Sequence, residues 1–100
     1  MKKKYLNYPS YPKWRKLMEN ATSSKNLMER YLHFFAATKI RVGNQLYNYS
    51  NFENIPEESD LPIIIYHAWT DEERPAKDVV RRLRKSGFKA SCKPDKELYQ

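Results

Sequence analysis

Six basic residues are concentrated in a segment of twelve residues near the C-terminus. They are Arg74, Lys77, Arg81, Arg82, Arg84 and Lys85. Spacings of three, four and three join four of them (74, 77, 81 and 84), and such spacings place side chains on one face of a helix. Guanidinium and ammonium groups bind phosphates, so this pattern predicts contact with a nucleic-acid backbone. The alternative is a solvated helix face. Solvated faces usually mix charges, however, and Asp78 is the only acidic residue here after Glu73.

Aromatic residues recur at every third position near the N-terminus. They are Tyr5, Tyr8, Tyr11 and Trp14. Two prolines follow tyrosines and favour an extended or polyproline II backbone, which repeats every three residues. Such a segment could stack its aromatic rings on unpaired bases while nearby cations contact phosphates. Those cations are Lys2, Lys3, Lys4, Lys13, Arg15 and Lys16. The alternative is an arm that packs over the core of its own domain.

Positive charge lies at the two ends of the chain. Residues 1–20 include six basic residues and one acidic residue, and residues 81–100 include seven basic residues and two acidic residues. Residues 41–80 hold three basic and eight acidic residues. This distribution predicts an electropositive surface built from both ends and a polyanionic partner.

Catalytic chemistry has weaker support. His67 could act as an acid or base oriented by Asp71 or Glu72, and Cys92 could act as a nucleophile. No glycine-rich phosphate loop, metal-ligand spacing or nucleophile elbow accompanies them. We therefore expect a protein that is not an enzyme and has no cofactor and no metal site.

Length and composition indicate one small domain. The chain has 100 residues, of which 40% are hydrophobic, 31% charged and 14% aromatic. The longest apolar run, residues 63–66, is far shorter than the roughly 20 residues that span a bilayer. A single cysteine needs no oxidising compartment. These features predict a cytoplasmic protein that does not enter a membrane.

The hydrophobic pattern predicts two N-terminal helices. The first begins at Pro12, and the second runs from about Lys25 to Thr38 after hydroxyl residues that can cap it. The apolar stripe of the second helix is Leu27, Met28, Tyr31, Leu32 and Phe35.

The remaining segments predict a sheet. Residues 40–49 form a hairpin around Gly43 and Asn44, and an acidic surface loop follows to Pro62. The apolar strand 63–69, a helix starting near Glu73 and ending at Ser86, and a strand around residues 88–93 form a βαβ unit.

The sequence thus predicts an α+β fold. Two N-terminal helices pack on a small mixed sheet of three or four strands that contains a C-terminal βαβ unit, in the order ααβββαβ. Residues 1–11 form a basic aromatic arm, and residues 12–100 form the domain. The predicted function is non-catalytic nucleic-acid binding that depends on charge or shape rather than base sequence.

Two alternatives stay open. One is a protein–protein interaction module, such as an inhibitor or assembly factor, with an interface around Phe52, Ile55 and the acidic loop. The other is a small enzyme that uses the loop containing His67 and Asp71. A protein partner and a homodimer are compatible with each hypothesis.

Overall fold

The structure is a computed structural model, and it describes residues 11–35, 38–57, 60–68 and 73–99. The α-helices are α1 (Tyr11–Glu19), α2 (Ser24–Phe34) and α3 (Glu73–Lys85). The strands are β1 (Lys39–Val42), β2 (Gln45–Tyr47), β3 (Ile63–His67) and β4 (Ala90–Pro94). Two 3₁₀ helices, η2 (Phe52–Asn54) and η4 (Asp95–Tyr99), complete the described elements. The predicted order ααβββαβ is confirmed.

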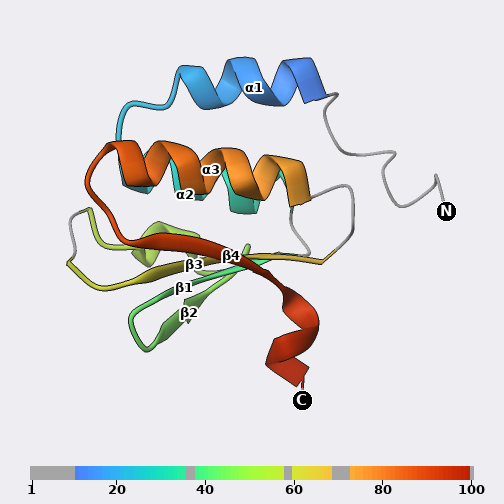
Figure 1. Cartoon of the computed structure of the whole chain (residues 1–100), viewed down its shortest axis with the longest axis vertical. Helices are drawn as coiled ribbons and strands as arrows, with labels where there is room; N and C mark the ends of the chain where they lie inside the picture. Colours follow the sequence, from blue (N-terminus) through green and yellow to red (C-terminus); the bar gives the residue numbers. More distant parts are fainter. Residues whose placement is uncertain (1–10, 36–37, 58–59, 69–72, 100) are drawn as a thin grey trace, which may run out of the picture.

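The four strands form one mixed sheet in the order β2-β1-β3-β4. Strand β1 is antiparallel to both β2 and β3, whereas β3 and β4 are parallel and joined through α3. The predicted mixed sheet with a C-terminal βαβ unit is therefore present (Figure 1).

The turn between β1 and β2 depends on Gly43. Its φ is 62°, a backbone conformation that glycine adopts at little energetic cost. Val42 pairs with Gln45 across this two-residue turn. A Cβ atom at Gly43 would lie 2.6 Å from Cδ1 of Leu61. The Gly43 N–H also donates to the Pro62 carbonyl over 2.9 Å, which joins the hairpin to the start of β3.

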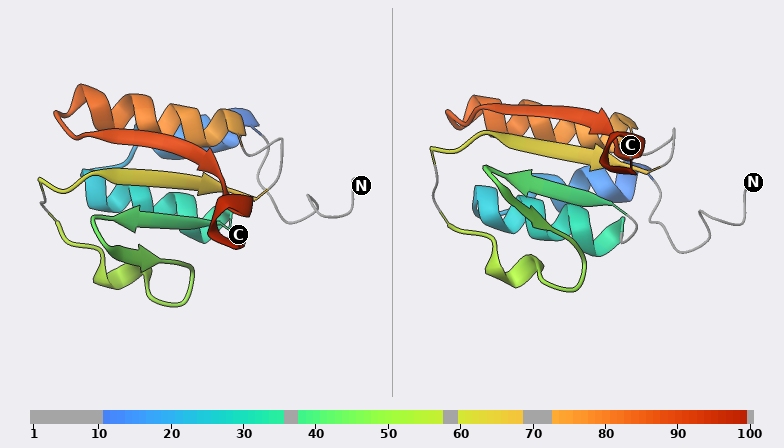
Figure 2. Two further views of the ribbon diagram at one scale, coloured as in Figure 1. Left: turned by 60° about the horizontal axis from the view of Figure 1, so that its bottom comes forward. Right: turned by 90° about the horizontal axis from the view of Figure 1, so that it is seen from below.

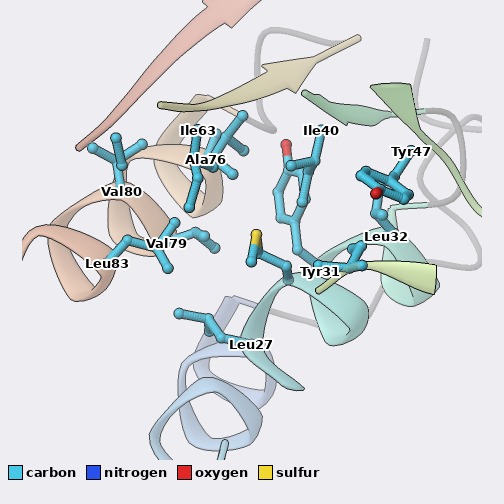
Figure 3. Close-up of a cluster of buried hydrophobic side chains, with 14 of the residues drawn as sticks. Leu27, Tyr31, Leu32, Ile40, Tyr47, Ile63, Ala76, Val79, Val80 and Leu83 are labelled. Atoms are coloured by element: carbon cyan, nitrogen blue, oxygen red, sulfur yellow. The ribbon is translucent and has the colours of Figure 1, made fainter. Parts of the chain in front are cut away.

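The helices form two layers on one side of the sheet. Helices α2 and α3 lie against the sheet, and α1 lies on their far side (Figure 1). The two N-terminal helices thus occupy different layers: α2 packs on the sheet directly, and α1 packs on α2 and α3. The core between α2, α3 and the sheet is apolar (Figure 3).

Helix α2 starts and ends through specific hydrogen bonds. The Ser23 hydroxyl accepts the Asn26 N–H over 3.0 Å, as expected of an N-cap. The helix ends at Phe34, earlier than predicted. Buried Thr38 donates both its N–H and its hydroxyl to the Phe35 carbonyl, which turns the chain into β1. The predicted apolar stripe of this helix is buried.

Trp14 fixes α1 to the rest of the protein. The residue is fully buried, and its ring lies edge-on to Tyr31 and Phe35 at centroid distances of 6.1 and 5.2 Å. Its Nε1 has no hydrogen-bond partner within the described part of the chain. An unsatisfied buried donor opposes folding, so the aromatic packing must outweigh its cost.

We expect Trp14→Ala to lower the free energy of unfolding by about 3–5 kcal/mol, because it removes a large buried side chain. Trp14→Phe keeps an aromatic ring and removes the unsatisfied N–H, so its cost should be below about 2 kcal/mol. Urea unfolding followed by circular dichroism measures both values. Equal costs for the two variants would contradict this account of α1 packing.

Candidate nucleic-acid interface

Helix α3 is strongly amphipathic. Its apolar face is buried and consists of Ala76, Val79, Val80 and Leu83 (Figure 3). Pro75 lies in the first turn, where its missing N–H leaves no intrahelical hydrogen bond unmade. Since the apolar face packs on β3 and β4, most cations of α3 must project away from the core.

Four of these cations line one groove between α3 and the edge strand β4. They are Lys77, Arg81, Arg84 and Lys85. The groove has a volume of about 640 Å³ and is completed by Val80, Ser91 and Cys92. We call this feature the basic groove. It combines a concave shape with four positive side chains.

Hydrogen bonds hold two of the arginines in the groove. Arg84 donates from Nε to the Ala90 carbonyl over 2.8 Å, and Arg81 donates to Asp78 over 3.1 Å. The Asp78 side chain is almost completely buried, whereas that of Arg81 is 70% exposed. The pair with Asp78 orients the Arg81 guanidinium but offsets part of its charge.

Lys77 forms a surface ion pair with Glu73 at 2.9 Å. This hydrogen bond raises the pKa of Lys77 and lowers the pKa of Glu73. Both groups stay charged through the neutral range, so Glu73 partly offsets the field of Lys77. Helix α3 still holds six basic and two acidic residues, and the groove keeps a positive balance.

The bond from Arg84 also protects the edge of the sheet. The Lys89 carbonyl accepts the Ile63 N–H, so the Ala90 carbonyl, one residue further on, points away from β3. The Ala90 carbonyl accepts the hydrogen bond from Arg84, and Pro94 has no N–H that could donate one. An added peptide strand would therefore lack an acceptor at Ala90 and a donor at Pro94. The groove is better suited to ligands that bind side-chain cations.

The other predicted cations have different positions. Arg74 is exposed at the start of α3, and Arg82 faces the α1–α2 turn together with Thr22 and Ser23. Lys13, Arg15 and Lys16 are exposed on α1, which neighbours α3. Residues 2–4, Tyr5 and Tyr8 lie outside the described residues, as does the Tyr11 side chain.

Trp14 does not fit its predicted role in base stacking. Its ring is fully buried among side chains of α2, so a base could reach it only if α1 moved away. The alternative prediction, packing over the protein's own core, is correct for this residue. The cause is its helical position: α1 already includes residue 14, and its apolar face turns inward.

Charge is separated across the sheet. The loop after β2 carries exposed Glu53, Glu57 and Asp60, and we call residues 53–60 the acidic loop. Its helix η2 lies at the β2 end of the sheet, whereas β4 and α3 lie at the opposite end (Figure 2). The charge is therefore distributed asymmetrically, with acidic residues at the β2 end and basic residues at the end formed by α3 and β4. Such an asymmetry can orient the protein toward an anion.

Sequence reasoning missed two features of the groove. It did not place Ser91 and Cys92 beside the helix cations, and it did not identify Asp78 as a buried partner of Arg81. The spacing of Asp78 and Arg81, three residues apart, was the available signal for that pair. The contact between β4 and α3 has no comparable local signal.

Only some of the residues in the enzyme hypothesis lie on neighbouring elements. His67 ends β3, and Cys92 lies on the neighbouring strand, whereas Asp71 is outside the described residues. Burial raises the pKa of Cys92, and this effect exceeds the opposing influence of Lys77 and Arg84. A nucleophilic cysteine usually has a lowered pKa, so this environment does not activate the thiol.

Two further features concern residues 11–35, 38–57, 60–68 and 73–99. Within those ranges, no group of three or more His, Cys, Asp or Glu side chains is arranged to hold a metal ion. No described helix is long and apolar enough to cross a membrane. Comparisons with protein-family models, curated proteins and solved structures find no match to the chain.

The raised pKa of Cys92 predicts a pH-dependent reactivity. Since burial disfavours the thiolate, alkylation by iodoacetamide should reach its midpoint at a higher pH in the native protein than in the urea-unfolded protein. Cys92 is the only cysteine, so mass spectrometry reports one site. A native midpoint at or below that of the unfolded protein would contradict the assignment.

Proposed function

We propose that the protein is a non-catalytic nucleic-acid-binding protein that contacts phosphates through the basic groove. The observation that carries this proposal is the convergence of four cations on one concave surface beside β4. Phosphates bind guanidinium and ammonium groups, and displaced counterions provide a favourable entropy. The residues that line the groove show no arrangement for recognising particular bases, so the proposed binding depends on charge and shape rather than on base sequence.

Neighbouring cations extend the proposed contact. Lys13, Arg15 and Lys16 on α1, with Arg74 and Arg82 on α3, would contact phosphates beyond the groove. The basic N-terminal residues Lys2, Lys3 and Lys4 would add to this charge, and Tyr5, Tyr8 and Tyr11 are the proposed stacking residues. The acidic loop at the far end of the sheet would be repelled by the polymer and would thereby orient the protein.

A second candidate function is protein binding through the opposite end. There the rings of His33 and Tyr49 lie 5.8 Å apart, and Phe52 lies 5.9 Å from Tyr49. Tyr49 is 50% exposed and borders the acidic loop, so this end would suit a basic protein partner. Ile55 cannot take part in the way the sequence suggested, because its side chain is buried in the core.

Removing two groove charges tests the nucleic-acid proposal. Lys77→Gln with Lys85→Gln neutralises two exposed cations and leaves the hydrogen bonds of Arg81 and Arg84 in place. We expect weaker binding to labelled DNA in fluorescence anisotropy. The slope of log affinity against log salt should fall by about two for duplex DNA, because each lost phosphate contact removes about 0.9.

The matched control is Lys25→Gln with Arg30→Gln on α2. It has the same net charge as the groove variant, but its substitutions lie outside the residues that line the groove. We expect its salt slope to stay close to that of the unsubstituted protein. Equal losses in both variants would show that overall charge, not the basic groove, attracts the polymer.

A further inference from the structure

The second face of the sheet carries a distinct set of side chains. Residues that alternate with the buried core positions point to this outer face, on which no described α-helix lies (Figure 2). They are Lys39, Arg41, Leu46, Ile64, Tyr66, Ser91 and Lys93. The set contains three basic residues and no acidic residue.

The strand register arranges these side chains in two rows. One row crosses all four strands and consists of Leu46, Arg41, Ile64 and Ser91. Neighbouring strands are about 4.8 Å apart, so this row is roughly 14 Å long. Its members are half-buried, and the row combines the apolar side chains of Leu46 and Ile64 with the basic side chain of Arg41 between them.

The second row consists of Lys39, Tyr66 and Lys93. Tyr66 is only 5% exposed, and η4 lies at this end of the outer side of the sheet (Figure 2). The tyrosine ring is therefore a packed side chain and not a stacking surface. The accessible part of the outer face is the row that contains Arg41.

The outer face is continuous with the basic groove. Ser91 belongs to the Arg41 row and also lines the groove, so the two surfaces meet at β4. A flexible polyanion bound in the groove could pass over this edge onto the sheet. A duplex is too stiff to follow so sharp a bend, since its persistence length is about 150 base pairs.

From this arrangement we infer that the outer face, centred on Arg41 and Ile64, binds single-stranded nucleic acid. The inference rests on the proposed function and specifies the polymer. Unpaired bases expose apolar faces that pack against Ile64 and Leu46 and stack on a guanidinium plane, and phosphates contact the groove. Paired bases hide those faces, so the duplex uses the groove alone.

The test compares a labelled single-stranded oligonucleotide with its duplex, using anisotropy at fixed salt. Arg41→Gln and Leu46→Glu alter the outer face, whereas Gln45→Glu adds the same charge to the neighbouring residue of β2, which points to the opposite face. We expect the two outer-face variants to weaken single-strand binding by about tenfold or more, while duplex binding changes by no more than about twofold. Gln45→Glu should change neither affinity.

The outcomes separate the two proposals. If the unsubstituted protein binds duplex and single strand but the outer-face variants leave their ratio unchanged, the inference is wrong and the basic groove remains the binding surface. If the unsubstituted protein binds neither polymer, the proposed function fails and the inference fails with it. Thermal unfolding checks the fold, and Arg41→Gln decides the question if Leu46→Glu does not fold.

Discussion

The structure depends on the packing of α3 against β3 and β4. Ala76, Val79 and Leu83 are buried on one side of this helix, so its many basic side chains must project from the other sides. The same packing brings β4 next to the helix and creates the basic groove from two segments. The burial of apolar side chains thus determines where the basic side chains lie, and it is sufficient to assemble the basic groove.

The one-sided covering of the sheet has a second consequence. Because the described α-helices all lie on one face, that face holds the core and α1 is displaced to an outer layer (Figure 1). Trp14 provides the aromatic contact that holds this layer. The opposite face keeps half-buried apolar and basic residues in register, and it meets the groove at Ser91. The basic groove therefore lies at the edge of the sheet opposite the acidic loop, and the outer face extends from that edge across all four strands.

The fold could be predicted largely from local patterns. The stripe of α2, the turn at Gly43 and the run from Ile63 to Tyr66 each have a periodicity or residue type with a direct backbone consequence. The candidate site was predictable only in part. The spacing of the α3 cations identified a charged face, but their partners depend on how the helix is rotated against β4. The prediction for Trp14 failed for a related reason: a spacing of three fits polyproline II and helix alike, and burial by α2 decides between them.

The most direct test is a nuclear magnetic resonance titration of the labelled protein with duplex DNA. We predict that the largest amide shifts fall on the two parts of the chain that supply the groove lining, which are the helix segment 77–85 and the strand residues Ser91 and Cys92. Shifts that decrease as salt is raised would agree with phosphate contact. Shifts confined to the acidic loop and the ring cluster around Tyr49, or no shifts at low salt, would contradict the central claim that this groove binds nucleic acid.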